Sequence, residues 1–472
     1  MKVALVNINR IRPPIAPLGL EYVAESLVAA GHSVALLDLT WSESPESAID
    51  DFFSRCDVGL VGISLRNTDD CAFTTKHSFL EAHGALIGRI RARTDALLVL
   101  GGAGFSVMPR AVLAQTAADA GIRGEGEFAF PLLADCLASN RPFDDVPGLI
   151  RRAPDGAWRE NPIRFGDLRA LPPMRRRFLD NVRYFSEGGQ AAVETSRGCP
   201  MPCTFCADPV AKGRALRLRA PQAVADEIEA LLAQGIDGFH TADSELNLNE
   251  AHLIAVCETI IARGLGEKVR WYAYANPVPF SKQTVRLAKK AGCAGIDFSV
   301  DHGDPDMLKR LGRTFSPADI LTVAESCADA GIAVMFDLLI GSPGETFDSV
   351  SRAVELMKRS RADRIGISLG LRVWPETALA RELLEPTPAI GLIGAPDPTE
   401  PLFFMASAVA DDIAAHISES IAGDPRFLFF NPSDNAKNYN YNDNRVLTDA
   451  VQAGFRGAYW DILRRLDNGE RV

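Results

Sequence analysis

The chain begins with short apolar runs that alternate with longer segments of helical period. A short apolar run predicts a strand buried on both faces, and a helical segment between two such runs predicts a βαβ unit. We therefore expect a doubly wound, Rossmann-like parallel sheet over about residues 1–150, with ligands bound beyond the carboxyl ends of its strands. The apolar runs lie at residues 3–6, 34–37, 58–63 and 96–100, and the helical segments lie at 18–30 and 75–93.

A second alternating region follows a connector of residues 151–190. From residue 191 to 385, strands and helical segments form about six β/α units, which suits a partial (β/α)6 barrel better than a complete eightfold one. In such barrels the catalytic groups lie at the carboxyl ends of the strands. Residues 386–472 predict a small, mostly helical C-terminal extension or lid, in which the tract 438–444 is rich in Asn and Tyr.

Composition is that of an ordinary globular protein. The 472 residues are 47% hydrophobic and 24% charged, and the formal charge is −11. This acidic balance argues against binding nucleic acid through a broad basic surface. No apolar run reaches the length of about 18 residues that a membrane-spanning helix needs, and the first residues become polar too early for a secretory signal. We expect a cytoplasmic protein of two or three domains that binds neither nucleic acid nor membrane.

Three of the nine cysteines are candidates for chemistry. The other six lie at wide intervals in segments that resemble buried helices or strands, as ordinary interior residues do. Cys199, Cys203 and Cys206 have C-x3-C-x2-C spacing in a loop with Gly and Pro, directly after a predicted strand. Structural zinc usually takes four protein ligands, and no fourth Cys or His lies nearby in sequence. Three thiolates suit a [4Fe–4S] cluster with one iron open to another ligand.

The cysteine loop resembles the signature of radical S-adenosylmethionine (SAM) enzymes, in the subfamily with an N-terminal cobalamin-binding-type domain. The sequence SRGCP at 196–200 and the aromatic Phe205 carry the resemblance in the loop. It implies that Cys199, Cys203 and Cys206 ligate three irons and that SAM chelates the fourth. It also implies that an electron from a reductase or flavodoxin-type donor cleaves SAM to modify a small molecule. Further similar stretches lie at residues 17–22, 31–34, 101–102, 124–127, 339–346 and 370–377.

The resemblance further implies SAM contacts at the carboxyl ends of the barrel strands. Phe205 is implied near the adenine, with a plain barrel aromatic as the alternative. Asp243 and Glu245 are implied near the SAM amine or the substrate, with helix capping as the alternative. Arg313 could pair with the SAM carboxylate or form a surface ion pair. The remaining implied contacts are Ser299 and Asp301 after the fourth strand, and Gly341 and Pro343 in a loop near the adenine.

The sequence does not decide whether the first domain binds cobalamin. The histidine of an Asp-x-His-x-x-Gly loop is absent, yet enzymes similar to this chain bind cobalamin without it. The loop 64–71 is polar and charged enough to contact substrate or SAM instead. The first domain therefore holds cobalamin or is a vestigial nucleotide-type domain. Its candidate contacts to cobalamin or substrate are Ser64, Asn67, Gly101, Gly102, Glu125 and Glu127.

Three functions follow from these alternatives. The first is cobalamin-dependent methyl transfer, or related bond formation, in secondary metabolism such as antibiotic biosynthesis. The second is cobalamin-independent transfer of the 3-amino-3-carboxypropyl group of SAM, as in arsinothricin biosynthesis. The third is a non-catalytic iron–sulfur or zinc protein, which would need no SAM site. The barrel motifs favour an enzyme, and nothing in the sequence identifies the substrate.

Overall fold

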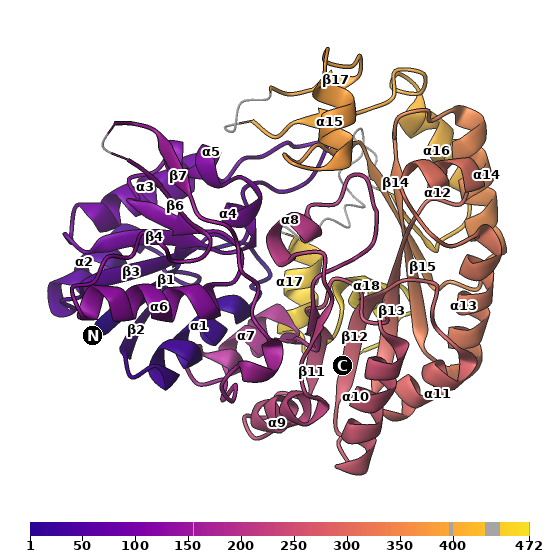
Figure 1. Cartoon of the computed structure of the whole chain (residues 1–472). Helices are drawn as coiled ribbons and strands as arrows, with labels where there is room; N and C mark the ends of the chain where they lie inside the picture. Colours follow the sequence, from indigo (N-terminus) through magenta and orange to yellow (C-terminus); the bar gives the residue numbers. More distant parts are fainter. Residues whose placement is uncertain (154, 396–399, 430–443, 472) are drawn as a thin grey trace.

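The computed structural model describes residues 1–153, 155–395, 400–429 and 444–471, and Figure 1 shows two helix-covered sheets side by side. The N-terminal sheet has the order β2-β1-β3-β4-β5-β6-β7, and its first five strands in sequence are parallel. The strand order reverses at β1, so ligands are expected beyond the carboxyl ends of β1 and β3. The strands are β1 (Lys2–Asn7), β2 (Ser33–Asp38), β3 (Leu60–Ser64), β4 (Leu97–Gly101), β5 (Ala120–Ile122), β6 (Leu149–Arg152) and β7 (Trp158–Glu160).

Helices cover both faces of this sheet. On one face α1 and α6 pack together over a core that includes Leu27 and Leu133, and on the other face α2 and α3 cover a core that includes Ile49 and Ile87. The buried strands therefore need apolar residues on both sides, as their continuous apolar runs predict. The helices are α1 (Leu18–Ala29), α2 (Pro45–Arg55), α3 (Leu80–Arg91), α4 (Ala103–Val107), α5 (Pro109–Ala114) and α6 (Gly126–Ala138).

Two boundaries differ from the sequence prediction. The sheet continues past residue 150, because β6 pairs antiparallel with β5 and β7 pairs antiparallel with β6. These strands are short and partly polar, so they lack a strong apolar signal. Helix α3 begins at Leu80 rather than near residue 75, because Asp69 and Ser78 form an isolated antiparallel bridge across the preceding turn.

The connector contains the short helix η1 (Leu168–Ala170) and α7 (Asn181–Gly188), and it carries part of a buried ionic network. Arg176 and Arg219 both pair with Glu227, at 2.8 and 2.6 Å, and Glu227 is 1% exposed. The Tyr22 hydroxyl, from the N-terminal sheet region, donates to Glu227 at 3.2 Å. We call these four side chains the Glu227 network. It joins the N-terminal region to α9 of the barrel.

The second sheet is a partial parallel barrel with the order β19-β15-β14-β13-β12-β11-β8. Six of its strands come from the predicted range, and the overall α/β fold class is confirmed. The seventh, β19, comes from the C-terminal extension and pairs with β15. Without β19 the outer edge of β15 would be unpaired. The strands are β8 (Ala191–Val193), β11 (Gly238–Thr241), β12 (Arg270–Ala275), β13 (Cys293–Asp301), β14 (Ala333–Ile340), β15 (Arg364–Leu369) and β19 (Phe427–Phe429).

Outer helices bury one side of each barrel strand, and capping residues set where several of them start. Ser316 forms a capping box with Asp319 at the start of α13. Thr346 does the same with Ser349 at the start of α14. The helices are α8 (Asp208–Lys212), α9 (Pro221–Leu232), α10 (Glu250–Ala262), α11 (Lys282–Lys290), α12 (Pro305–Arg310), α13 (Pro317–Ala330), α14 (Phe347–Arg359) and α15 (Ala378–Leu384).

The C-terminal extension also closes the barrel from within. Trp460 packs with Tyr272 and Met335 in a small buried cluster, and its ring fills the space beside Gly295. The Asn- and Tyr-rich tract lies almost wholly in residues 430–443, outside the described residues. In the part of the chain that is described, no helix is long and apolar enough to cross a membrane. The remaining elements are β9 (Ser196–Arg197), β10 (Arg217–Leu218), β16 (Leu371–Arg372), β17 (Leu392–Ile393), β18 (Phe403–Phe404), α16 (Ile413–Ile421), α17 (Arg445–Gln452) and α18 (Tyr459–Asp467).

Candidate active site

The cysteine loop leaves β9 and ends at α8, and backbone contacts fix its course. The Cys199 N–H donates to the Gly213 carbonyl at 3.0 Å, and the Thr204 N–H donates to the Leu311 carbonyl at 3.1 Å. Gly198 has a φ of +93°, and a Cβ there would lie 2.2 Å from the Ala215 carbonyl oxygen. Only glycine fits this close approach of two backbone segments.

The three thiols lie at the mouth of the barrel and are free of disulfides. Burial raises the pKa of Cys203 to about 11 and that of Cys206 to about 12, and the thiols are near enough to raise one another's pKa. Within the described residues no three His, Cys, Asp or Glu side chains already converge on a metal position. A metal centre would therefore supply the charge that stabilises thiolates here. Three neighbouring thiols on one loop fit the donor set of an iron–sulfur cluster.

Four of the predicted SAM contacts come together beside this loop. The Arg313 guanidinium pairs with Asp301 and lies 3.9 Å from Glu245. Its central carbon is 5.9 Å from the centre of the Phe205 ring. Burial raises the pKa of Glu245 to about 8, and the Oε2 atom of this side chain is buried without a hydrogen-bond partner. Arg313 is therefore a buried ion-pair partner rather than a surface one, and Glu245 has an oxygen to offer a ligand.

Asp243 holds the strand that enters the cysteine loop. Its Oδ1 accepts from the Thr195 N–H at 3.1 Å, from the Thr195 hydroxyl at 3.0 Å and from the Ser196 hydroxyl at 2.8 Å. The Ser196 N–H donates to the same oxygen. Burial raises the pKa of Asp243 to about 6, and its Oδ2 atom has no partner among the described residues. Its observed contacts are thus to the backbone and hydroxyl groups of Thr195 and Ser196, and only Oδ2 remains for a ligand.

The last three predicted SAM contacts lie on neighbouring strand ends. Ser299 lies within β13, two residues before Asp301. Gly341 follows β14 with a φ of +109°, and a Cβ there would lie 2.5 Å from the Met405 sulfur. Pro343 follows in the same loop. The glycine therefore lets this loop pack against the segment after β18.

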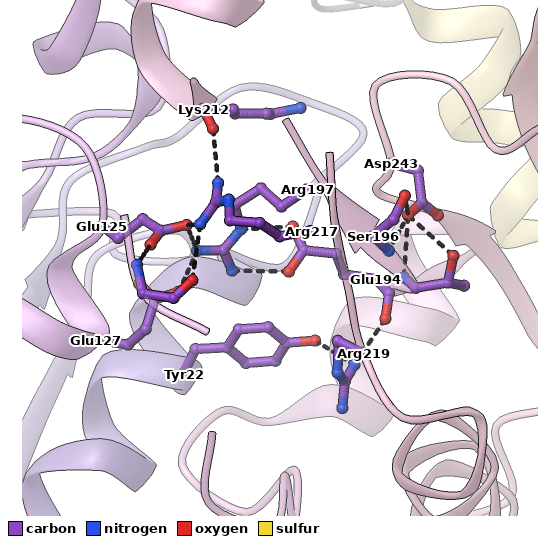
Figure 2. Close-up of polar contacts among 12 residues, drawn as sticks. Tyr22, Glu125, Glu127, Glu194, Ser196, Arg197, Lys212, Arg217, Arg219 and Asp243 are labelled. Atoms are coloured by element: carbon purple, nitrogen blue, oxygen red, sulfur yellow. Dashed lines mark hydrogen bonds and ion pairs between the residues drawn. The ribbon is translucent and has the colours of Figure 1, made fainter. Parts of the chain in front are cut away.

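Arg197 stands at the boundary between the two sheets, within a group of buried charges that Figure 2 shows. Its guanidinium pairs with Glu194 at 2.7 Å, with Glu125 at 2.9 Å and with Glu127. Arg217 also pairs with Glu125. We call these five side chains the Arg197 clasp. Because Arg197 lies two residues before Cys199, the clasp ties the start of the cysteine loop to α6 of the N-terminal region.

A cavity of about 520 Å³ runs from the N-terminal sheet into the barrel. Its N-terminal wall follows the carboxyl ends of β1, β3, β4 and β5, as expected for a doubly wound sheet. Its other wall continues down the inner faces of barrel strands to α18. Among the predicted cobalamin or substrate contacts, the lining includes Ser64, Gly101, Gly102, Glu125 and Glu127.

Comparison with known proteins identifies the two halves. Residues 4–134 match the B12 binding domain, and residues 193–357 match the radical SAM superfamily. The chain is 33% identical over 446 residues to a tryptophan 2-C-methyltransferase of Streptomyces laurentii, covering 81% of this chain and 74% of that protein. The chain belongs to the radical SAM enzymes that carry a B12-binding domain. It is therefore an enzyme of a cobalamin-dependent methyltransferase family, and a non-catalytic role is overturned.

Solved structures of radical SAM methyltransferases agree over nearly the whole chain. The structure of TsrM from Kitasatospora setae with tryptophan and a SAM analogue matches with a TM-score of 0.89 and 28% identity, over 99% of both chains. A second structure of TsrM, with cobalamin and a [4Fe–4S] cluster, matches with a TM-score of 0.89, 27% identity, and 99% of this chain and 98% of that one. The family's cofactors are thus the [4Fe–4S] cluster and SAM, as predicted from the sequence, and cobalamin, which the sequence left open.

The N-terminal wall of the cavity fits the cofactor of a B12-binding radical SAM enzyme. Gly102 has a φ of +98°, and a Cβ there would lie 2.5 Å from the Leu65 carbonyl oxygen. Gly62, Gly101 and Gly124 line the same wall, so backbone forms part of it. Glycine at these strand ends lets a large flat cofactor approach them. Asn67 is absent from this lining, although it lies in the loop after β3.

Sequence reasoning missed several cavity residues of this radical SAM enzyme. Glu125 and Glu127 were expected to meet a ligand, yet both carboxylates are engaged by arginines of the clasp. Their engagement needed Arg197 and Arg217 from the other sheet, which no local pattern reveals. A sequence signal did exist for Asp297 and Asp337, because each acid interrupts an otherwise apolar barrel strand. The cavity residues that were missed are Arg66, Lys212, His240, Tyr274, Asp297 and Asp337.

Proposed function

We propose that this enzyme transfers the methyl group of SAM to a carbon atom of a small molecule, with cobalamin as the methyl carrier. The observation that carries the proposal is the continuous cavity, which connects the glycine-lined edge of the N-terminal sheet with the interior of the barrel. A methyl carrier bound at that edge and a substrate inside the barrel would meet in one water-excluded space.

In this proposal each half of the chain has a separate task. The domain of residues 1–150, extended by the β6–β7 hairpin, holds cobalamin, and the barrel of 191–385 holds the cluster and SAM. Cys199, Cys203 and Cys206 ligate the cluster, which supplies one-electron chemistry when it is bound. A reductase or flavodoxin-type protein supplies the electron. The described residues of the C-terminal extension cover the barrel and close its interior with α18.

The proposed SAM contacts are the groups that converge beside the cysteine loop. Arg313 offers a cation for a carboxylate, and its pairing with Asp301 fixes its orientation. The unpartnered Oε2 of Glu245 can accept from an amine. Phe205 offers a ring face beside Arg313. Tryptophan, which a 33% identical relative carries in its name, is the first substrate to test.

Product analysis tests this function directly. The enzyme is reconstituted without oxygen with cluster and cobalamin, and is then given a reductant, tryptophan, and SAM whose methyl group carries deuterium. We expect a product that has gained one labelled methyl group, together with S-adenosylhomocysteine. Labelled methylthioadenosine without methylated product would instead indicate 3-amino-3-carboxypropyl transfer. A small-molecule panel replaces tryptophan if it is not methylated, and absence of labelled methyl in any product refutes the proposal.

A further inference from the structure

Two acids face each other inside the barrel on neighbouring strands. Asp297 lies on β13 and Asp337 lies on β14, which pair in parallel. Ile296 and Phe298, on either side of Asp297, are buried in the core between the strands and the outer helices. Because side chains alternate along a strand, Asp297 points the other way, into the barrel. The same alternation turns Asp337 inward, and both acids line the cavity.

Neither acid is neutralised by the protein. Asp297 is only 3% exposed, and the Oδ1 atoms of both side chains are buried without a hydrogen-bond donor among the described residues. Neither carboxyl takes part in an ion pair within that part of the chain. Burial and the neighbouring Asp337 raise the pKa of Asp297, and burial raises the pKa of Asp337 to about 6. The two carboxyls hydrogen-bond to each other, which requires a proton on one of them.

The surroundings of the pair repel a further anion. The other charged groups that act on Asp297 are Glu245 and Asp301, which are also acids. His240 lines the cavity too, and burial lowers its pKa to about 4, so its ring is neutral. The Nδ1–H of His240 donates to the Thr241 carbonyl at 2.7 Å, which leaves Nε2 as a further acceptor. Arg197 and Lys212 also line the cavity, but they pair with Glu194 and Asp208, and the charges that act on Asp297 are all acidic.

Aromatic rings and a closed floor limit what can enter. The Tyr274 ring lies 4.8 Å from the His240 ring, and both line the cavity. Below the acids, Trp460 closes the barrel beside Met335. Asp297 lies four residues before Asp301 on β13, and the register of the strand shifts between Phe298 and Asp301. The pair is therefore deeper in the barrel than the Arg313 group that we assign to SAM.

We propose that Asp297 and Asp337 form the subsite that binds a protonated amine of the small-molecule substrate. An ammonium group offers three N–H donors and a positive charge to the acceptors of this pocket. It would also lie against the faces of aromatic rings, which attract cations. A buried, unpaired carboxyl costs stability unless a ligand compensates it, which explains why the two acids are retained in an apolar lumen. The inference rests on the proposed function, because it makes the occupant the methyl acceptor.

Binding of matched amines and amine-free compounds to the cofactor-loaded enzyme tests the proposal without turnover. The probes are tryptamine with 3-propylindole and 2-phenylethylamine with propylbenzene, measured by calorimetry. A charge-assisted hydrogen bond predicts that at least one amine binds about tenfold to a hundredfold tighter than its partner compound. Asp297→Asn and Asp337→Asn should each remove most of that preference. Asp461→Asn is the matched control, since Asp461 is buried but bonds to Tyr272 and Arg464 instead.

Each outcome decides the proposal. Equal binding of amines and their partner compounds, or no binding of any amine at millimolar concentration, would overturn it. An amine preference that survives in both Asn variants would do the same. S-adenosylhomocysteine serves as a second ligand: if the Asn variants weaken it as much as the amines, the pair serves the amino group of SAM instead. A preference for amines in an enzyme that methylates nothing would leave this subsite standing and refute only the proposed function.

Discussion

The Arg197 clasp and the Asp297–Asp337 pair border the same cavity but treat buried charge in opposite ways. In the clasp Arg197 faces carboxylates from both halves of the chain and Arg217 faces Glu125, so the charges are compensated within the protein. In the pair, two acids face each other, and the Oδ1 atom of each meets no donor among the described residues. Compensated buried charges hold the backbone in place, whereas uncompensated buried charges that line a cavity indicate a ligand site.

The largest effect on activity should come from substitution of the cluster-binding cysteines, because only a bound cluster gives these thiols a partner. Cys203→Ala should abolish methyl transfer because the cluster loses one of three thiolates, while the fold persists. Iron content, the absorbance of the cluster and product formation are measured together. Cys71→Ser, at an exposed cysteine outside the loop, is the control and should keep full activity. Full turnover by the Cys203 variant would refute cluster ligation by this loop.

The Glu227 network should show the cost of breaking compensated charge. Glu227→Gln leaves Arg176 and Arg219 buried with less negative charge, which should reduce the free energy of unfolding by about 3–5 kcal/mol. Thermal unfolding of the ligand-free protein measures it. The adjacent Asp226→Asn removes only the exposed pair with Arg263 and should change stability by less than about 1 kcal/mol. Equal effects of the two variants would contradict the distinction between the buried and exposed pairs.

The clasp itself should affect the cluster loop more than the fold. Arg197→Lys keeps a charge but cannot reach Glu194 and Glu125 together with a planar fork. Partners behind metal ligands typically contribute about tenfold to a hundredfold in activity, and we expect a loss of that size. The electron paramagnetic resonance signal of the reduced cluster should change as well. Arg169→Lys, at an exposed arginine, should leave rate and signal unaltered, and an unchanged signal in the Arg197 variant would contradict the positioning role.

Substitution of Gly102 tests whether cobalamin binds at the glycine-lined edge of the N-terminal sheet. Gly31, another glycine with positive φ, serves as the comparison. Gly102→Ala and Gly31→Ala both place a side chain at positive φ, which costs about 1–2 kcal/mol in either case. Only at Gly102 would the new Cβ meet backbone, at 2.5 Å, because nothing lies within 4 Å of Gly31. We expect cobalamin affinity, followed by absorption spectroscopy, to fall about tenfold in the first variant alone. Equal affinity in both variants would place cobalamin away from this edge.

Sequence patterns predicted the fold and the cysteine loop because those depend on local signals. Apolar runs define the strands, and the spacing of Cys199, Cys203 and Cys206 lies within one loop. The engagement of Glu125 by Arg197 could not be predicted, since it joins residues far apart in sequence. The same holds for β19, a short strand that pairs only because β15 offers an open edge. Asp297 and Asp337 each carried a readable signal, an acid within an otherwise apolar strand, but no local pattern showed that the two acids face each other.

The smallest effect concerns the pH dependence of stability. The pKa of Asp337 is raised by burial from 3.8 to about 6, so the folded protein holds a proton that the unfolded chain releases. The resulting stabilisation is complete below pH 4 and is lost as the pH rises through about 6. Asp337→Asn cannot release that proton, so its stability relative to the parent should increase by on the order of 1 kcal/mol between pH 4 and 7.

Thermal unfolding of the ligand-free parent and of the Asn variant across this pH range measures the difference. Asp50→Asn is the control and should show no slope against the parent from pH 4 to 7, because Arg93 and Arg89 lower the pKa of Asp50 to about 2 and its stabilisation is lost only below about pH 4. Parallel curves for the parent and the Asp337 variant would mean that the acid is already compensated. The contrast between the clasp and the pair would then disappear, because a satisfied carboxyl needs no amine from a substrate.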